Sequence, residues 1–366
     1  MAWQQEELYR GPSIGGTGTC HRPGSSGPHS FPRMESPPGR RDGSTAADAA
    51  LGRSGHDGDA DGNACRSSIP RASSAGSSPR LSSRLGDQNV ARCLFEWHSL
   101  MAAIQFLTRI PVPGGMHRPG ADMAILHHSL IYFPLVGGGI AGFTGVIFSL
   151  SAMWWSPLVA ALLALAAEAL LTGGFHEDAV ADSCDAFGGG WTKDDVLRIM
   201  KDSRVGSYGA LGLILAVALR ASLIAQLDPV YVTGVVAVST IALSGALGRW
   251  TILLMRTIYP TIPGREGLSK DIAGNVTVRS LVWGTLTLSP FMMLSTLALG
   301  FSGPGISGQG MACLEVMGAA GAAGFVGLLW AKYAYGRLEG LTGDVLGCGC
   351  YLGQLAALLV MSTGSR

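Results

Sequence analysis

The sequence predicts an all-α membrane protein, a polytopic helical bundle of about seven transmembrane helices with a disordered N-terminal tail. The 366 residues are 48% hydrophobic and 14% charged, with 26 Lys and Arg against 25 Asp and Glu. Residues 1–93 contain 11 of these basic and 9 of these acidic residues. Only about 11% of residues 94–366 are therefore charged, which is too few for a water-facing surface.

The N-terminal tail, residues 1–93, is predicted to be disordered. Gly, Ser and Pro occupy about 40% of its positions, and no apolar periodicity continues for three turns. Its opening residues, MAWQQEELYR, lack the apolar run of a secretory signal. We interpret the tail as an unstructured extension, or as residues upstream of a later start at Met34 or Met101, rather than as a regulatory segment. The transmembrane domain is expected to comprise residues 94–366.

The segment from Leu94 to Pro113 joins the tail to the first long apolar stretch. It is short and of mixed polarity, with Trp97, Phe106 and the run FLTRIPVP. Apolar and aromatic residues mixed with polar ones are typical of a helix that lies along a membrane surface. The segment is therefore predicted to be an interfacial helix.

Seven stretches after residue 125 are long and apolar enough to cross a hydrocarbon core, which takes about 20 helical residues. Helix is the expected conformation, because unpaired backbone groups are costly in lipid and no stretch alternates with the period of a barrel strand. Repeated glycines in the first and sixth stretches predict close helix contacts. The stretches run approximately from Leu130 to Met153, Pro157 to Phe175, Val205 to Leu227, Val230 to Met255, Leu281 to Gly300, Met311 to Ala331 and Gly343 to Met361.

The basic residues that flank these stretches predict the orientation. If the residues before the first stretch are cytoplasmic, 12 of the 15 Lys and Arg residues after position 93 lie on that side. Arg366 alone falls outside, and Arg220 and Arg249 fall within stretches. The segment between the second and third stretches is therefore expected to face the cytoplasm.

Composition excludes two classes of site. A formal net charge of +1 and the lack of a dense Lys and Arg cluster argue against nucleic-acid binding. The seven cysteines contain no CxxC pair, and only Cys348 and Cys350 lie close together. They predict neither a zinc site nor a disulfide framework.

The segment between the second and third stretches is strongly acidic, with seven of the 16 acidic residues after position 93. Asp178, Asp182 and Asp185 stand at i, i+4 and i+7, so on a helix they share one face. Stacked like charges are costly unless a cation neutralises them, and carboxylates at a water boundary favour Mg²⁺, or Mn²⁺. Glu177 and His176 crowd the same turn. The alternative is a solvated acidic helix at the membrane surface.

A second polar cluster follows the acidic one and consists of Arg198, Lys201, Asp202, Ser203 and Arg204. Basic side chains beside a carboxylate-bound metal are what a phosphate or pyrophosphate substrate requires for charge neutralisation. The pair of clusters therefore predicts a phosphate-binding site. His176 is either a general base or a residue that only makes hydrogen bonds.

Charged residues inside the apolar stretches are few, and each is a candidate functional residue because of its cost in lipid. Glu168, Arg249 and Asp344 are expected to lie at or below the same face as the acidic segment and to line one cavity with it. Arg220 lies deeper in its stretch. It is either a ligand-binding residue or the ion-pair partner of Glu168.

At these residues the sequence resembles the cobalamin synthase family, the adenosylcobinamide-GDP ribazoletransferases. The resemblance extends in order over roughly residues 94–366. The matching motifs are QFLTRIPVP at Gln105 to Pro113, FPLVGGGIAG at Phe133 to Gly142, TGGFHEDAVADSCDAFGGG at Thr172 to Gly190, RIMKDSRVGSYGALGL at Arg198 to Leu213, LGRW at Leu247 to Trp250 and LTGDVLG at Leu341 to Gly347.

The resemblance implies a transferase of cobalamin (vitamin B12) biosynthesis in the bacterial inner membrane. A hydroxyl of α-ribazole, or of its 5'-phosphate, would attack the cobinamide-side phosphorus of adenosylcobinamide-GDP and expel GMP. The implied Mg²⁺ ligands are Asp178, Asp182 and Asp185, with Glu177 as a further ligand or base. Asp202 would orient or deprotonate the hydroxyl. The implied substrate-binding residues are His176, Arg198, Lys201, Arg204, Arg249 and Asp344. A homo-oligomer is compatible with the sequence.

The sequence departs from the family pattern at four positions. Ala179 and Ala186 stand where Gly is usual, and Tyr351 and Gln354 stand where a Glu is common. These changes concern local packing and any acid in the last stretch, and they leave the aspartates intact. Two alternative functions are a CDP-alcohol phosphotransferase-like lipid enzyme, whose DGxxAR opening is absent, and a transporter.

Overall fold

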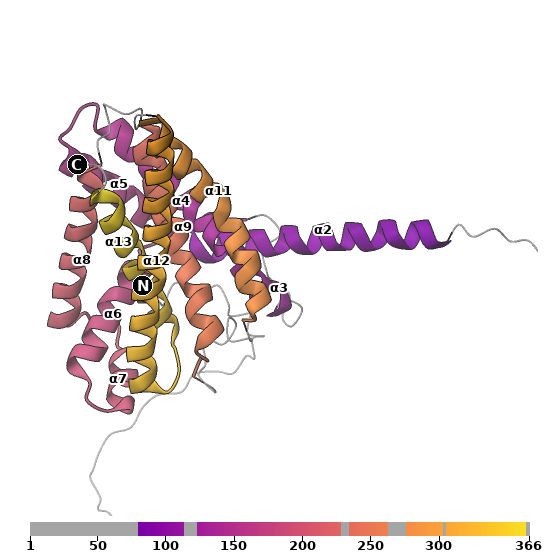
Figure 1. The fold of residues 1–366 in the computed structure, drawn as a ribbon. Coiled ribbons are helices and arrows are strands. Elements are labelled where there is room, and N and C mark those ends of the chain that lie inside the picture. Colours follow the sequence, from indigo (N-terminus) through magenta and orange to yellow (C-terminus); the bar gives the residue numbers. More distant parts are fainter. Residues whose placement is uncertain (1–79, 113–122, 228–233, 263–275, 303–304, 364–366) are drawn as a thin grey trace, which may run out of the picture. The chain divides into compact units, whose positions relative to one another are not determined.

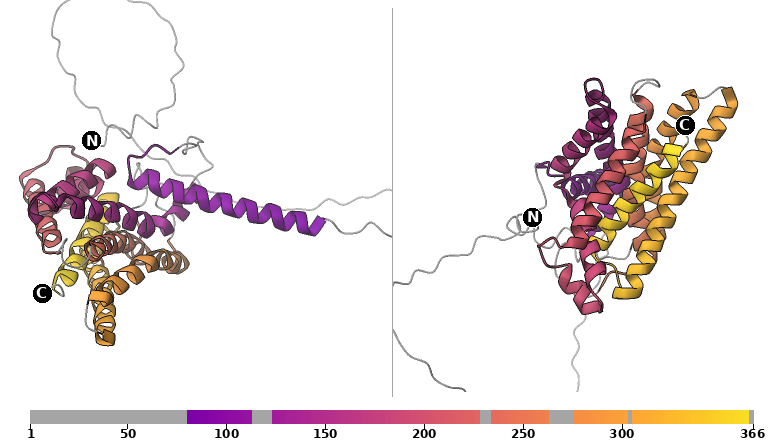
Figure 2. Two further views of the ribbon diagram at one scale, coloured as in Figure 1. Left: turned by 90° about the horizontal axis from the view of Figure 1, so that it is seen from above. Right: turned by 90° about the vertical axis from the view of Figure 1, so that its left-hand side faces the viewer.

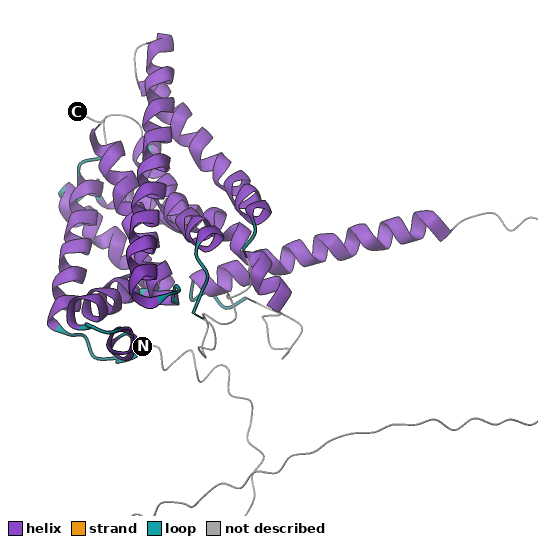
Figure 3. Cartoon of the chain, turned by 60° about the horizontal axis from the view of Figure 1, so that its bottom comes forward, coloured by secondary structure: helices purple, strands orange, loops and turns teal. Residues whose placement is uncertain are grey.

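The computed structural model describes residues 80–112, 123–227, 234–262, 276–302 and 305–363. The disorder predicted for residues 1–79 lies outside these ranges. Within them every regular element is a helix (Figure 3). The one strand-like feature of these ranges is an isolated bridge between Thr261 and Leu341. The predicted all-α class is confirmed.

The helices follow one another along the chain (Figure 1). Their bounds are α2 Arg80–Leu107, α3 Met123–Ser129, η1 Leu130–Tyr132 (a 3-10 turn), α4 Phe133–Ser151, α5 Pro157–Thr172, α6 Phe175–Gly189, α7 Lys193–Ile199, α8 Ser207–Ala225, α9 Val235–Ile258, α11 Val278–Ser302, α12 Gly305–Leu338 and α13 Gly343–Thr363.

Six helical segments are long and apolar enough to cross a membrane, and the bent pair α5 and α6 is a seventh candidate. The prediction of about seven spans is confirmed. The second predicted span is wrong in detail, because its helix ends at Thr172 rather than Phe175 and continues, after a 93° bend, as α6. The other segments are Ala124–Ser151, Ser207–Ala225, Val235–Ile258, Val278–Gly300, Gly308–Leu338 and Gly343–Thr363.

Helix α2 begins at Arg80, before the predicted domain boundary at Leu94. Residues 80–93 were expected to belong to the tail, but they contain a single glycine and no proline, and Leu81 and Leu85 recur at helical spacing. The N-terminal part of α2 extends sideways from the other helices (Figure 2). Val90, Leu94 and Trp97 form an exposed apolar stripe on it, a feature typical of interfacial helices.

Helices α9 and α13 are largely buried, whereas α8, α11 and α12 leave most of their surface exposed. Glycines allow α4 to approach α9 closely, since a Cβ at Gly145 would lie 2.8 Å from Cα of Val238. The close contact predicted for the first apolar stretch is thereby confirmed. Helix α6 packs mainly against α13 and α8.

Candidate active site

A sharp elbow separates α5 from α6. Gly173 and Gly174 both adopt left-handed backbone conformations, with φ of 80° and 70°, which non-glycine residues rarely adopt. The backbone nitrogen of Arg109 donates a hydrogen bond to the carbonyl oxygen of Leu171 (2.8 Å). The Arg109 side chain lies against Gly173, where a Cβ would be 2.9 Å from its Cζ atom. The elbow therefore sets the point at which the acidic helix begins.

The acidic segment is a helix packed within the bundle rather than a surface loop. On one side Ala179 contacts α13, since a Cβ at Gly347 would lie 2.6 Å from the Ala179 Cβ. The hydroxyl of Ser183 donates to the carbonyl oxygen of Asp344 (3.3 Å) on the same helix. The Ala179 side chain thus fits at this contact because its partner on α13, Gly347, is a glycine.

Asp178, Asp182 and Asp185 share one face of α6, as their spacing predicted. Asp178 is exposed and the other two are half-buried. Asp344, at the start of α13, also lies near Asp182. Asp182 thus has three acidic neighbours, which are Asp178, Asp185 and Asp344. We call the carboxylates of Asp178, Asp182 and Asp344 the aspartate face.

Asp185 has a different environment from the other two aspartates. Its carboxylate accepts hydrogen bonds from the backbone nitrogens of Gly206 (2.6 Å) and Gly209 (2.8 Å), at the start of α8. These amides would otherwise lack partners, because the first turn of a helix leaves its N–H groups unpaired. Both oxygens of Asp185 are thus engaged in capping α8. Asp185 therefore also caps α8, and its part in a metal site stays a prediction, because each carboxylate oxygen keeps a second lone pair.

The carboxylates best placed to hold a metal are those of Asp178 and Asp182, with Asp344 nearby and Asp185 on the same face of α6. In the described part of the chain no three His, Cys, Asp or Glu residues form a ready-made metal cluster. Mg²⁺ is commonly bound by one or two carboxylates together with substrate phosphates, so a pair of aspartates on an open face suits it. The residues fit a divalent cation whose coordination a phosphate ligand would complete.

A buried ion cluster lies at the N-terminal end of α6. Arg220 on α8 donates to both carboxylate oxygens of Glu168 on α5, at 2.9 and 2.8 Å. Arg220 also lies 3.7 Å from Glu177, and Arg249 on α9 lies 4.0 Å from Glu168. Of the two alternatives left open for Arg220, the structure shows the ion pair with Glu168. Glu177 faces this cluster.

The other predicted residues at this end of α6 are buried beside the cluster. His176 is buried, and its Nε2 atom has no hydrogen-bond partner among the described residues. The ring of Tyr351 lies 5.4 Å from the Arg220 guanidinium, and Gln354 is buried on the same helix. An aromatic face thus stands beside the arginine at the position where the resemblance led us to expect a glutamate.

The basic cluster lies at the opposite end of α6 and is exposed. Arg198 pairs with Asp195 (3.4 Å) and Arg204 with Asp202 (2.7 Å), and Lys201 is exposed. Hydrogen bonds from Arg204 lower the pKa of Asp202 to about 2, so this carboxylate is a weak base. Gly206, two residues after Arg204, touches Asp185, which brings the cluster next to the aspartate-bearing helix.

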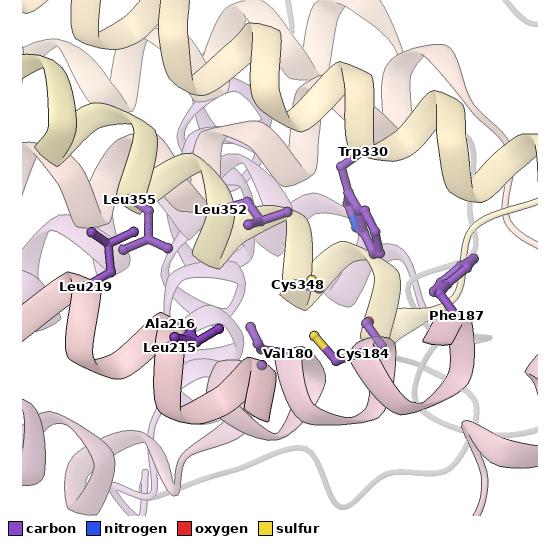
Figure 4. Close-up of a pocket in the computed structure, with 12 residues that line it drawn as sticks. Val180, Cys184, Phe187, Leu215, Ala216, Leu219, Trp330, Cys348, Leu352 and Leu355 are labelled. Carbon is purple, nitrogen blue, oxygen red and sulfur yellow. The ribbon is translucent and has the colours of Figure 1, made fainter. Parts of the chain in front are cut away.

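The reverse face of α6 lines an apolar cavity of about 410 Å³. Val180 and Cys184 of α6 face Cys348 and Leu352 of α13, and Trp330 of α12 closes one end (Figure 4). Helix α6 therefore carries carboxylates on one side and apolar side chains on the other. This asymmetry directs polar ligands to the aspartate face.

Sequence reasoning missed three residues that shape the site. Ser183 bonds to the backbone of Asp344, Thr144 donates to Glu168 (2.7 Å), and Arg109 packs on the elbow. Arg109 lies in the QFLTRIPVP motif, which was the only signal for it. Ser183 lies in the motif TGGFHEDAVADSCDAFGGG, whereas Thr144 carries no such signal, because its partner Glu168 lies on another helix.

Comparison with known proteins gives a consistent result. The family described as cobalamin-5-phosphate synthase matches residues 99–362. A Leptothrix cholodnii protein named adenosylcobinamide-GDP ribazoletransferase is 34% identical over 275 residues, 74% of this chain and 97% of that protein. Relatives of the same name from Ralstonia nicotianae (34% over 274 residues, 72% of this chain and 94% of the relative) and Shewanella baltica (46% over 141 residues, 37% and 53%) also match. No solved structure matches.

Proposed function

The chain belongs to the cobalamin-5-phosphate synthase family, and from that premise we propose how its residues carry out the reaction. It is a multi-pass membrane transferase of cobalamin biosynthesis that acts on adenosylcobinamide-GDP. The second substrate is α-ribazole or its 5'-phosphate. The observation that carries the proposed site is the aspartate face, formed by α6 and the start of α13, next to an exposed group of arginine and lysine side chains.

The reaction transfers the cobinamide phosphate to a ribazole hydroxyl. A bond forms between the hydroxyl oxygen and the cobinamide-side phosphorus, and the bond from that phosphorus to the bridging pyrophosphate oxygen breaks. GMP leaves with the bridging oxygen, and the hydroxyl proton passes to a carboxylate of the aspartate face. Adenosylcobalamin, or its 5'-phosphate, is the second product.

Asp178 and Asp182 would hold Mg²⁺ or Mn²⁺, with Asp344 beside them. When bound, the cation neutralises charge on the pyrophosphate and orients it. Arg198, Lys201 and Arg204 bind the guanosine-side phosphate and stabilise the charge of departing GMP. Asp202 keeps the Arg204 side chain near the site. Glu177, which faces Arg220, is assigned to the buried cluster.

The direct test is release of GMP by the full chain in detergent or lipid nanodiscs. GMP should appear from adenosylcobinamide-GDP only when α-ribazole or its 5'-phosphate and a divalent cation are present. Separate assays with the two ribazole forms identify the acceptor by the larger kcat/KM. GMP release without either acceptor, or transfer to a diacylglycerol instead, would contradict the proposal.

We also propose that the site faces the cytoplasm of a bacterial inner membrane, because the basic residues collect on that side. Single cysteines at positions 194 and 305, in a chain freed of its seven native cysteines, test this orientation. An impermeant thiol reagent added outside cells should modify position 305 and spare position 194. Labelling of position 194 alone would reverse the assignment.

A further inference from the structure

We propose that Arg109 and Arg220 are positioning residues that hold the elbow between α5 and α6, so that Asp178 and Asp182 face the substrate. The inference rests on the proposed function, because it takes the aspartate face as the site of reaction. Neither arginine needs to touch the substrate. Each fixes the direction in which α6 leaves the elbow.

Arg220 joins the two arms of the elbow. Its Nη2 atom donates to both oxygens of Glu168, which precedes the bend, and its Nη1 atom lies 3.7 Å from Oε1 of Glu177, which follows it. A planar guanidinium with several fixed donors can engage two carboxylates at once, whereas a lysine ammonium is a single point charge. One side chain on α8 thus restrains both arms.

The Arg220 bridge is held in one geometry by its burial. Arg220 and Glu168 side chains are 1% and 3% exposed, and the Thr144 hydroxyl donates to Oε2 of Glu168 (2.7 Å). A buried charge that loses its partner is strongly destabilised, so alternative arrangements of the elbow are costly. The angle between α5 and α6 is therefore coupled to this ion pair.

Arg109 acts on the elbow from a third segment, the residues that follow α2. Its backbone is bonded to Leu171 in the last turn of α5, and its guanidinium occupies the space beside Gly173. Asp185 fixes the other end of α6 through its bonds to Gly206 and Gly209. With both ends fixed, the positions of Asp178 and Asp182 along α6 are determined.

The two elbow glycines provide a matched pair of variants. Both have left-handed backbones, so alanine strains the chain similarly at either position. A Cβ at Gly174 meets nothing within 4 Å in the described structure, whereas a Cβ at Gly173 meets the Arg109 guanidinium. The difference between Gly173→Ala and Gly174→Ala therefore isolates the contact with Arg109.

The first experiment measures kcat, the KM for adenosylcobinamide-GDP and the Mg²⁺ dependence of these two variants at equal folded amounts. The kcat of Gly173→Ala should be at least tenfold lower than that of Gly174→Ala. Its half-saturating Mg²⁺ concentration should be higher, and its KM should differ less than threefold. In an Arg109→Ala background the extra effect of Gly173→Ala should disappear, because the added Cβ then has space. Equal effects of the two alanines would overturn the role of Arg109.

The second experiment compares Arg220→Lys with Arg256→Lys. Arg256 is also buried, and at the end of α9 its Nη1 atom donates to the Tyr259 carbonyl (3.2 Å). Arg220→Lys keeps the charge and should fold, yet its kcat should fall at least tenfold with an altered Mg²⁺ dependence. Arg256→Lys should stay within twofold of wild type. If folded Arg220→Lys turns over like wild type, Arg220 has no positioning role.

Asp182→Asn, measured in parallel, separates failure of this inference from failure of the proposed function. Wild-type turnover by Asp182→Asn would remove the aspartate face from the reaction. Loss of turnover in Asp182→Asn combined with normal turnover in Gly173→Ala and Arg220→Lys would leave the site in place and overturn the elbow inference alone.

Discussion

The two ends of α6 carry charged clusters of opposite character. At its N-terminal end, Arg220 and Glu168 are 1% and 3% exposed and pair at 2.8 Å. Beyond its C-terminal end, Arg204 and Asp202 pair at 2.7 Å, but their side chains are 86% and 38% exposed. Pair distances are thus nearly equal, while the surroundings differ completely.

This difference in exposure indicates a structural role for the buried cluster and a ligand-binding role for the exposed one. A buried ion pair cannot exchange partners with water, so it holds the helices that carry it in one arrangement. An exposed pair contributes little to stability, and its arginine can turn towards an incoming phosphate at small cost. The buried cluster is therefore suited to orient α6, and the exposed cluster to bind the nucleotide that leaves. The aspartate face lies between them.

The largest expected effect is on folding, from Arg220→Met. This change leaves the buried Glu168 carboxylate without its main partner and should lower the free energy of unfolding by about 3–5 kcal/mol. Adding Glu168→Gln should recover most of that loss, since the uncompensated charge is gone. Unfolding in detergent micelles, followed by circular dichroism, measures both, with Arg204→Met as the exposed control that should not change stability. If Arg220→Met and Arg204→Met lowered the free energy of unfolding equally, the proposed difference between the buried and the exposed cluster would be wrong.

The next effect is on catalysis, from Asp182→Asn. The change removes one charge from the aspartate face at constant volume, so the protein should fold, while kcat falls by at least 10²-fold, or about 3 kcal/mol. GMP release against Mg²⁺ concentration provides the measurement. Asp194→Asn on the exposed side of α7 is the control and should stay within twofold. A solvated acidic helix would instead give normal turnover and an unchanged metal dependence.

Asp185→Ala should act mainly on stability. It removes two hydrogen bonds that cap α8, and loss of a helix cap costs about 1–2 kcal/mol. Because Asp185 is assigned to the cap, the half-saturating Mg²⁺ concentration of the folded variant should change less than in Asp182→Asn. A larger metal effect in Asp185→Ala would return Asp185 to the metal ligands.

Arg204→Ala tests the exposed cluster as a phosphate-binding site. The KM for adenosylcobinamide-GDP should rise about three- to tenfold, and the difference from wild type should shrink as ionic strength increases, because exposed charges are screened by salt. The unfolding midpoint should stay the same. Lys332→Ala, another basic residue, on α12, serves as the control with an unaltered KM.

The smallest effect concerns pH. The pKa of Asp202 is lowered to about 2 by the hydrogen bonds from Arg204, so its carboxylate is charged above that pH and loses its charge only as the pH falls through about 2. Between pH 5 and 9 its protonation does not change. Asp202→Asn should therefore leave the shape of the pH–rate profile unaltered over this range. An acidic limb that vanishes in this variant would restore Asp202 as the base.

Much of the fold follows from the length of the apolar stretches, and the candidate carboxylates follow from their spacing. The break in the second stretch was not predicted, because Pro157 to Phe175 has the length and composition of an ordinary span. Adjacent glycines indicate only that a bend is allowed. Its 93° angle depends on contacts with Arg109 and Arg220, which belong to distant segments.

The sequence by itself determined that this protein is a membrane helical bundle and that Asp178, Asp182 and Asp185 share a helix face. Those properties depend on local composition and on the helical repeat. Only the tertiary structure decided that Asp185 caps α8 and that Glu177 turns towards Arg220, whereas Asp344 was already expected beside the acidic segment. Helical spacing gives the direction of a side chain about its own axis, but a carboxylate's role depends on whether a neighbouring helix offers it amides, a guanidinium or another carboxylate.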